Sequence, residues 1–427
     1  MLLHNPFKVK HPACAALSKT ADIYYNNPMK RLAFVIPWYS DEVRGGAETE
    51  LRGIAKHLAA SGIELEILTT CVKEFSSDWS VNYYKEGEAV EGGLKVRRFP
   101  ARKRDTEAFD SVNLKFIKGI PVTAEEEQIF MKEMVNSPAL YEYIGQHKDE
   151  YALFVHIPYM FGTAYYGIKA APEKSVLIPC LHEEAYAHMS LYKDVFSKTA
   201  GMIYLSTPEM KLANELYDLS NVRQEVLGAG VDSDFDPDPA RFRSKYKIGD
   251  PFILYAGRKD TGKNVDLLIS YFREFKRRNP SESGLKLVLI GGGRIDIPAD
   301  CSKEIIDLGF VDRADKYDAC AAALCMCQPS THESFSIVIM ESWLCGRPVL
   351  VHENCDVTCA FAKESNSGLY FKDFYDFEGA VKYYIDNPET AASMGQTGKT
   401  YVEERFTWDV ITRKYTEFFE EVSNEED

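Results

Sequence analysis

Two cations and two carboxylates in the second half of the sequence have side chains suited to holding a nucleoside diphosphate. Arg258 and Lys263 flank a short polar loop, and paired cations can stabilise the charge on a departing diphosphate without a metal ion. Glu333 and Glu341 border an almost wholly apolar segment. A carboxylate inside a buried helix needs a polar partner, and the cis hydroxyls of a ribose would give Glu341 two hydrogen bonds. Each residue also has a purely structural explanation. Arg258 and Lys263 could be solvated surface charges, Glu333 could cap the helix, and Glu341 could form a hydrogen bond within the protein.

A glycine pair and a histidine in the first half are candidates for the same ligand. Gly45 and Gly46 precede an expected helix, where backbone without Cβ atoms can approach a phosphate and free N–H groups attract it. The spacing differs from the G-x-G-x-x-G pattern of dinucleotide sites, and a simple turn would also explain the pair. His182 follows an apolar strand and precedes two glutamates, so we expect it at a cleft, with His156 as its rival.

Each of these groups follows or precedes an apolar run of the kind that forms buried parallel strands. The expected strands are Leu32–Ile36, Ile63–Thr69, Lys95–Phe99, Leu153–Ile157, Ser175–Pro179, Met202–Ser206, Phe252–Ala256, Lys286–Ile290, Ala323–Cys327 and Pro348–Val351. Glycine, aspartate and proline concentrate in residues 228–239, which is the best linker candidate. This alternation in two halves predicts an α/β protein with two doubly wound, Rossmann-like domains. Such sheets bind ligands at the carboxyl ends of their strands, so the two domains would share one cleft.

The composition narrows the class of protein. The chain has 427 residues, 45% of them hydrophobic, with a formal net charge of −15. That charge argues against nucleic acid as a partner. No apolar run reaches the ~18 residues that a membrane span needs, and the first thirty residues lack a secretory signal. The ten cysteines lack the CxxC spacing of a metal site, so we expect no metal and a reducing, cytoplasmic location.

Three segments together resemble a known family. Gly45-Gly46-Ala47-Glu48, YAGRKDTGKNVDLLI and HESFSIVIMESWLCGRPV, in this order, are similar to the motifs of retaining glycosyltransferases of the GT-B fold, in particular glycosyltransferase family 4 (glycosyl transferases group 1). The resemblance implies an acceptor-side domain over residues 31–235 and a nucleotide-sugar domain over residues 236–405. Residues 406–427 would form a C-terminal helix that packs back on the first domain, and residues 1–30 an extension.

The resemblance also implies roles for individual residues. Arg258 and Lys263 would hold the donor diphosphate, Glu341 the ribose, and Glu333 the hydroxyls of the donor sugar. His182 would lie near the reacting carbon and complete the catalytic set of Glu333, Arg258 and Lys263. The remaining donor-binding residues implied by the family are Gly46 under the diphosphate, Gly292 and Phe310 beside the nucleotide, and Phe335 and Ser336 through their backbone amides.

Two features depart from the family pattern or extend it. Ser336 stands where the family often has glycine, so its side chain could restrict which sugar fits. The basic run from Lys95 to Arg104 stands out in an acidic chain. As in many relatives, such a run could contact anionic lipid headgroups or a diphosphate-linked acceptor, although a solvated strand edge would explain the charges equally well.

The function implied is transfer of a hexosyl group from a nucleotide-diphosphate sugar to an acceptor hydroxyl with retention of configuration. The acceptor would be a saccharide or a lipid-linked molecule in surface polysaccharide or glycolipid synthesis, and the enzyme would work in the cytoplasm, at or near the inner face of the membrane. The nucleotide sugar is a substrate, so no cofactor is expected. Two alternatives remain open, a nucleotide-sugar 2-epimerase and a non-catalytic scaffold that binds a nucleotide sugar.

Overall fold

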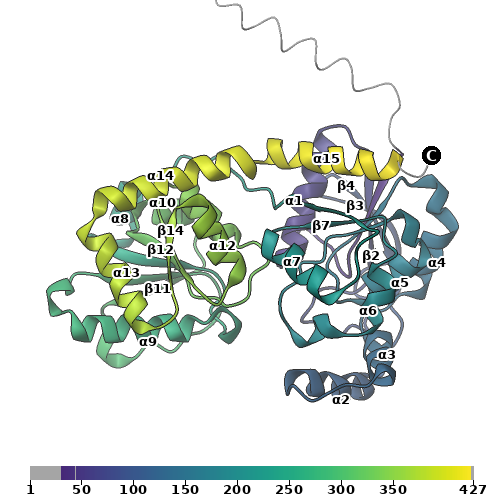
Figure 1. Cartoon of the computed structure of the whole chain (residues 1–427), viewed down its shortest axis with the longest axis horizontal. Helices are drawn as coiled ribbons and strands as arrows, with labels where there is room; N and C mark the ends of the chain where they lie inside the picture. The colour runs from purple at the N-terminus through teal and green to yellow at the C-terminus, as the bar shows by residue number, and fades with distance from the viewer. Residues whose placement is uncertain (1–29, 44, 425–427) are drawn as a thin grey trace, which may run out of the picture.

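The computed structural model describes residues 30–43 and 45–424 and forms two lobes (Figure 1). The expected extension over residues 1–30 lies outside the described residues except for Lys30. Each lobe contains one sheet with helices on its faces, so the expected α/β class with two Rossmann-like domains is confirmed. No helix in the described part of the chain is long and apolar enough to cross a membrane.

The N-terminal sheet has eight strands in the order β3-β4-β2-β1-β5-β6-β7-β8, all parallel except β3. Its strands are β1 (Leu32–Val35), β2 (Leu65–Thr70), β3 (Gly87–Glu91), β4 (Leu94–Phe99), β5 (Phe154–His156), β6 (Ser175–Leu177), β7 (Gly201–Tyr204) and β8 (Arg223–Val226). The helices of this lobe are α1 (Gly46–Ala60), α2 (Thr106–Ile117), α3 (Ala124–Glu133), α4 (Pro138–His147), α5 (Gly162–Ala170), α6 (Leu191–Phe196) and α7 (Thr207–Leu216).

The C-terminal sheet has six parallel strands in the order β11-β10-β9-β12-β13-β14. They are β9 (Phe252–Ala256), β10 (Lys286–Ile290), β11 (Ile305–Gly309), β12 (Cys325–Gln328), β13 (Val349–His352) and β14 (Gly368–Phe371). Its helices are α8 (Pro239–Tyr246), α9 (Val265–Arg278), α10 (Arg313–Ala322), α11 (Ile337–Leu344), α12 (Asp356–Ser365), α13 (Phe374–Asp386) and α14 (Pro388–Arg405). The inner strands are fully buried, which explains their continuous apolar sequences.

The last helix, α15 (Trp408–Asn424), joins the two lobes. It continues from α14 on the C-terminal lobe and lies across the N-terminal lobe (Figure 1, yellow). The Trp408 ring stacks on His57 of α1 with centroids 4.1 Å apart, and the rings of Phe419 and Phe34 lie 6.4 Å apart. Between the lobes, α12 contacts α7. These contacts hold the two sheets in a defined relation.

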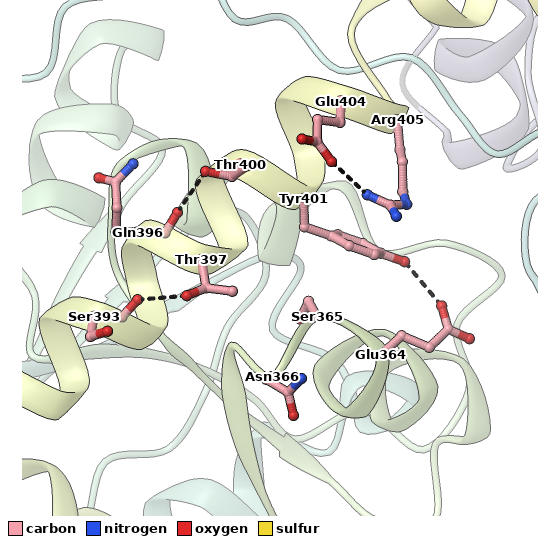
Figure 2. A pocket seen from close by; sticks show the side chains of 10 residues that line it. All are labelled: Glu364, Ser365, Asn366, Ser393, Gln396, Thr397, Thr400, Tyr401, Glu404 and Arg405. Carbon is pink, nitrogen blue, oxygen red and sulfur yellow. Dashed lines mark hydrogen bonds and ion pairs between the residues drawn. The ribbon is translucent and has the colours of Figure 1, made fainter.

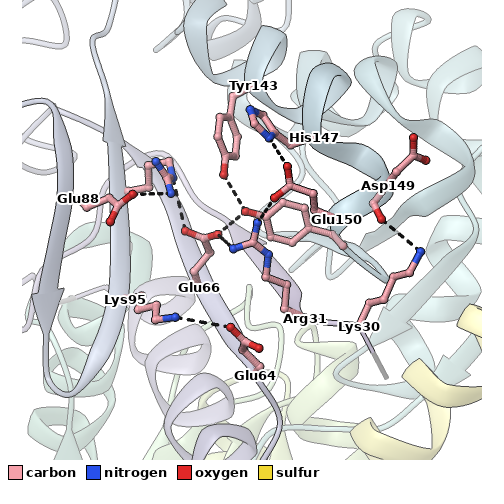
Figure 3. Close-up of polar contacts among 12 residues, drawn as sticks. Lys30, Arg31, Glu64, Glu66, Glu88, Lys95, Tyr143, His147, Asp149 and Glu150 are labelled. Atoms are coloured by element: carbon pink, nitrogen blue, oxygen red, sulfur yellow. Dashed lines mark hydrogen bonds and ion pairs between the residues drawn. The ribbon is translucent and has the colours of Figure 1, made fainter. Parts of the chain in front are cut away.

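A buried carboxylate ties the first strands of the N-terminal sheet together (Figure 3). Glu66 of β2 is almost fully buried and lies 3.2 Å from Nη1 of Arg31 and 3.5 Å from Nε of Arg97. The hydroxyl of Tyr151 also donates a hydrogen bond to Glu66. Because both arginines lack another buried acceptor of this kind, the carboxylate stabilises the junction of β1, β2 and β4.

Replacing Glu66 with alanine is therefore expected to lower the free energy of unfolding by about 2 kcal/mol. The expected loss of unfolding free energy is smaller than for a fully buried ion pair, because the side chains of Arg31 and Arg97 are about a quarter exposed. Urea unfolding of the purified variant measures the change. Glu64→Ala is the matched control, since the Glu64–Lys95 pair is exposed and should change stability by less than about 0.5 kcal/mol. Equal effects of the two substitutions would contradict this assignment.

Most of the basic run is neutralised within its own lobe. The ion pairs are Lys95 with Glu64, Arg97 with Glu66 and Glu88, Arg98 with Glu91, and Arg102 with Glu133. These ion pairs reduce the local cationic charge that a patch would need, which favours the alternative of a solvated strand edge for these four residues. Membrane contact through residues 95–104 stays a prediction.

Candidate functional site

Lys263 and Glu333 form the centre of the site. Lys263 ends the turn after β9, and Glu333 lies in the loop between β12 and α11. The Lys263 Nζ lies 2.6 Å from Oε1 of Glu333, and the two side chains are 24% and 11% exposed. Gln328 of β12 donates a second hydrogen bond of 3.3 Å to the same oxygen. The structure thus brings together one cation and one carboxylate that the sequence singled out separately.

Arg258 lies in the same loop as Lys263 but is oriented differently. Its guanidinium is 77% exposed and lies 3.5 Å from Asp260, while its backbone carbonyl accepts a hydrogen bond from Tyr255. The backbone is fixed and the side chain extends into solvent. Arg258 is thus free to turn toward an anion, but in this structure it is not part of the Lys263–Glu333 pair.

Glu341 lies buried in the second turn of α11 and has a partner that the sequence did not reveal. Lys316 of α10 forms an ion pair with its Oε1, and the hydroxyl of Tyr317 donates to the same oxygen at 3.2 Å. These two contacts satisfy the buried carboxylate. The position of Lys316 in the first helix after the Leu308–Phe310 loop could have suggested a place near the nucleotide site. Its pairing with Glu341 could not be predicted, because that contact depends on how α10 packs on α11.

Ser336 occupies a backbone conformation that favours glycine. It precedes α11 with φ of 69° and ψ of 72°, in the left-handed region, and its side chain is buried. A serine held there is strained. This strain explains why a glycine would be natural at the start of this helix and why Ser336 is a departure.

Ser336→Gly is expected to raise the free energy of unfolding by about 0.5–1 kcal/mol, because relief of the strain exceeds the entropy that glycine adds to the unfolded chain. Chemical denaturation measures the change. Ser336→Ala keeps the strained backbone and serves as the control, which should show no gain. A loss of stability in the glycine variant would contradict this explanation.

The three-glycine loop after β10 packs directly on the loop that carries Arg258. A Cβ on Gly291, where φ is 122°, would lie 2.0 Å from the carbonyl oxygen of Gly257. The buried Lys259 Nζ donates to the Gly291 carbonyl and to Asp307, both at 2.6 Å. Lys259, which sequence reasoning missed, therefore fixes the ends of β9, β10 and β11 relative to one another and is structural rather than free to bind a ligand.

The other predicted donor-binding residues lie around these loops in different environments. A Cβ on Gly292 would lie 2.6 Å from the Phe310 ring, and that ring is 73% exposed. The Phe335 ring is buried against Phe361 and Phe406, so only its backbone can face a ligand. Gly46 begins α1, and a Cβ placed on it would meet nothing within 4 Å. The start of α1 is therefore open at Gly46, while the carboxylate of Glu48 fills the space beside Gly45.

His182 of the N-terminal lobe meets the C-terminal lobe at the Glu333 loop. Its ring centroid lies 5.9 Å from that of His332, the residue before Glu333. Nε2 of His182 lies 3.4 Å from Glu184, whose other oxygen accepts a hydrogen bond of 2.6 Å from the Tyr159 hydroxyl. His156, the rival, is fully buried and bonds to Ser175 at 3.1 Å. The structure thus places His182, and not His156, beside the Glu333 loop.

Glu184 controls the charge of His182. Burial alone would lower the pKa of His182, but the hydrogen bond and the charge of Glu184 raise it overall. The pKa of Glu184 is lowered, because its bonds to His182 and Tyr159 outweigh the effect of burial. The pair stabilises the fold while His182 is protonated and Glu184 ionised. Its contribution is lost as the pH rises through the raised pKa of His182, or falls through the lowered pKa of Glu184.

Glu184→Gln is expected to lower the pKa of His182, because the counter-charge is removed while the size of the side chain is kept. NMR titration of the histidine rings measures this shift. His352 of the C-terminal lobe, whose pKa is lowered by burial, is the internal control, and its titration should not change. An unchanged His182 titration would contradict the role assigned to Glu184.

A separate hollow lies between the end of α12 and α14 of the C-terminal lobe and shares no residue with the predicted site (Figure 2). Its volume is about 440 Å³, and polar side chains of α12 and α14 line it. Within the described residues, no cluster of three or more histidine, cysteine or carboxylate side chains is placed to hold a metal ion.

The comparisons with known proteins concern the family and the fold of the chain. The family model described as Glycosyl transferases group 1 matches residues 238–401, the segment that contains Arg258, Lys263, Glu333 and Glu341. The "D-inositol 3-phosphate glycosyltransferase" of Frankia alni is 24% identical over 336 residues, which cover 72% of this chain and 77% of that protein. The expected resemblance is therefore confirmed.

Solved structures show the same fold. A sucrose-phosphate synthase from Thermosynechococcus elongatus aligns with a TM-score of 0.66 at 15% identity, covering 92% of this chain and 99% of that one. HepE of Anabaena, solved in complex with UDP-glucose, aligns with a TM-score of 0.62 at 15% identity, covering 92% of this chain and all of the other. These alignments confirm the GT-B fold.

Proposed function

We propose that this chain, a glycosyltransferase whose residues 238–401 belong to the Glycosyl transferases group 1 family, transfers a hexosyl group from a nucleotide-diphosphate sugar with retention of configuration. The observation that supports this most strongly is the meeting of Lys263 and Glu333 beside His182 and His332, across the two lobes. A bound diphosphate would replace Glu333 as the ion-pair partner of Lys263. The carboxylate of Glu333 would then accept hydrogen bonds from the hydroxyls of the donor sugar.

The mechanism follows from this arrangement. The bond between the anomeric carbon and the diphosphate oxygen breaks while an acceptor oxygen attacks the same face, and the departing diphosphate accepts the acceptor's proton. Lys263 and Arg258 stabilise the charge that develops on the diphosphate, and the open start of α1 at Gly46 offers backbone N–H groups to it. The protein supplies position and charge rather than a separate base.

The acceptor is proposed to be a hydroxylated molecule bound mainly by the N-terminal lobe. The name of the Frankia relative suggests a phosphorylated polyol as one candidate, and a saccharide or lipid-linked acceptor in polysaccharide or glycolipid synthesis is the other. A cytoplasmic enzyme that works at the inner face of a membrane would fit the second candidate.

Thermal shift against UDP-, GDP-, ADP- and dTDP-sugars tests the proposal first, since a ligand that prefers the folded state raises the melting temperature. With the selected donor, nucleotide release should require an acceptor, and NMR of the product should show the anomeric configuration of the donor. Interconversion of nucleotide sugars without an acceptor would instead indicate an epimerase. Binding of a donor without any turnover would indicate a scaffold.

A further inference from the structure

Aromatic side chains gather at the edge of the N-terminal sheet where strands β1, β2 and β5 end. Trp38 follows β1, Phe75 and Trp79 follow β2, and Phe161 follows β5. These strands are parallel to one another and to β6, so their carboxyl ends lie along the edge from which the His182 loop also leaves. The aromatic cluster therefore lies along the same edge as the candidate site.

Trp79 is the centre of this cluster. Its ring stacks with Trp38 at a centroid distance of 6.0 Å and contacts Phe109 at 5.8 Å and Phe161 at 6.2 Å. Phe75 lies 5.8 Å from Trp79 but is 63% exposed. A large ring that is exposed while it is held by packed neighbours offers a rigid apolar surface to a ligand.

Arg104 lies against the same rings. Its guanidinium carbon is 4.5 Å from the Trp79 centroid and 4.2 Å from that of Phe109. Two aromatic contacts hold the planar group in one orientation, so little entropy would be lost when it binds an anion.

Arg104 differs from the other arginines of its basic run. Arg97, Arg98 and Arg102 each have a carboxylate partner. Across residues 30–43 and 45–424, the Arg104 guanidinium has no ion pair within 4 Å, and its buried Nε has no hydrogen-bond partner. A fixed arginine without a counter-charge is suited to an anion from outside the chain.

The charged groups around Arg104 do not supply the carboxylate partner that its guanidinium lacks. Asp110, Asp78 and Glu133 act on it from a distance, with Arg102 opposing them, yet burial is the largest influence and lowers the pKa of Arg104. The guanidinium stays charged at any physiological pH. Arg104 is therefore a partly buried cation that forms no ion pair with these three carboxylates among the residues that the structure describes.

We propose that Arg104, Trp79 and Phe75 form an anion-recognising part of the acceptor site that binds a phosphate-bearing acceptor. The guanidinium would donate paired N–H bonds to the phosphate oxygens, and the exposed ring of Phe75 would contact the apolar face of the acceptor. This proposal rests on the proposed function, because it assigns the substrate of the same cleft.

The position of this surface limits the acceptor further. Trp38 lies in the loop that leads to Gly45 and Gly46, and Phe161 lies two residues after Tyr159, which bonds to Glu184 beside His182. The ends of β2 and β6 are three strand spacings apart, or about 14 Å. An acceptor that spans both strand ends would carry its phosphate several bonds away from the hydroxyl that reacts, so inorganic phosphate and D-glucose 6-phosphate probe the phosphate end of this surface alone.

Calorimetric titration tests the proposal on the full chain saturated with the nucleotide diphosphate that the thermal-shift panel selects. The soluble probes are inorganic phosphate and D-glucose 6-phosphate, with D-glucose as the uncharged comparison. The lipid probes are phosphatidylglycerol vesicles, with phosphatidylcholine vesicles as their comparison. The variants are Arg104→Gln, Arg104→Lys and Lys103→Gln, which removes an exposed neighbouring charge of the same run.

Arg104→Gln is expected to weaken binding of the phosphate probes about tenfold or more, Arg104→Lys by less, and Lys103→Gln by less than about twofold. Loss with D-glucose 6-phosphate supports a soluble phosphorylated acceptor, and loss confined to phosphatidylglycerol vesicles supports a lipid headgroup. Failure of every probe to bind, or equal binding by wild type and Arg104→Gln, overturns the proposal. Failure of every donor in the panel to bind the wild type would count against the proposed function, whereas a loss confined to the Arg104 variants concerns the acceptor site alone.

Discussion

Replacing Lys263 with alanine is expected to lower kcat/KM for sugar transfer by about 10²- to 10³-fold. Lys263 is the one predicted diphosphate ligand that already lies within the central cluster, since Arg258 extends into solvent and Lys259 is engaged by Gly291 and Asp307. Its removal also leaves Glu333 without its cation, so the negative charge of the diphosphate would face a bare carboxylate. Both binding of the nucleotide and transfer should therefore fail.

Steady-state kinetics with the selected donor and calorimetric binding of the nucleoside diphosphate measure the two effects. Lys303→Ala is the matched control, because it removes an exposed lysine from the same lobe. Its kinetics should match those of the wild type. A Lys263→Ala enzyme that retains more than about a third of the wild-type kcat/KM would show that the diphosphate binds elsewhere.

Glu333→Gln is expected to separate binding of the nucleotide from transfer of the sugar. The glutamine removes the charge that neutralises Lys263, so the nucleoside diphosphate should bind as tightly as before or a few times more tightly. Transfer should fall about 100-fold, since the uncharged amide no longer stabilises the positive charge on the reacting sugar. The two substitutions at one ion pair thus have opposite effects on nucleotide affinity.

The control for this prediction is Glu353→Gln, which removes a carboxylate from the loop after β13 without touching the pair. The double variant Lys263→Ala with Glu333→Gln should lose less than the product of the single losses, because the residues contact each other. Strictly multiplicative losses, or weaker nucleotide binding in Glu333→Gln, would contradict the pairing of these two residues.

The sequence was sufficient to predict the fold class and the approximate positions of the central residues. Lys263 and Glu333 each follow a strand, and the strands concerned, β9 and β12, are neighbours in a parallel sheet. Residues in those positions must come close, because parallel strands end at the same edge. The buried strands were also clear, since the inner strands β9, β12 and β13 are continuous apolar runs.

The elements that sequence reasoning missed are those that depend on packing. The edge strands β3, β8, β11 and β14 were not expected, because they are partly exposed and their sequences lack a long apolar run. The structural role of Lys259 could not be separated from a ligand-binding role, since both functions suit a lysine in a polar loop. Likewise, nothing in the run from Lys95 to Arg104 distinguishes Arg104 from its paired neighbours.

The most direct test of the account is a crystal structure with the nucleoside diphosphate of the selected donor. Lys263 is expected to leave Glu333 and bind a phosphate oxygen at about 2.8 Å, while Glu341 accepts hydrogen bonds from the ribose and Lys316 moves aside. His182 should remain at the same cleft, next to the vacated Glu333. A nucleotide bound away from these residues, with the Lys263–Glu333 pair intact, would contradict the central claim that this pair marks the donor site.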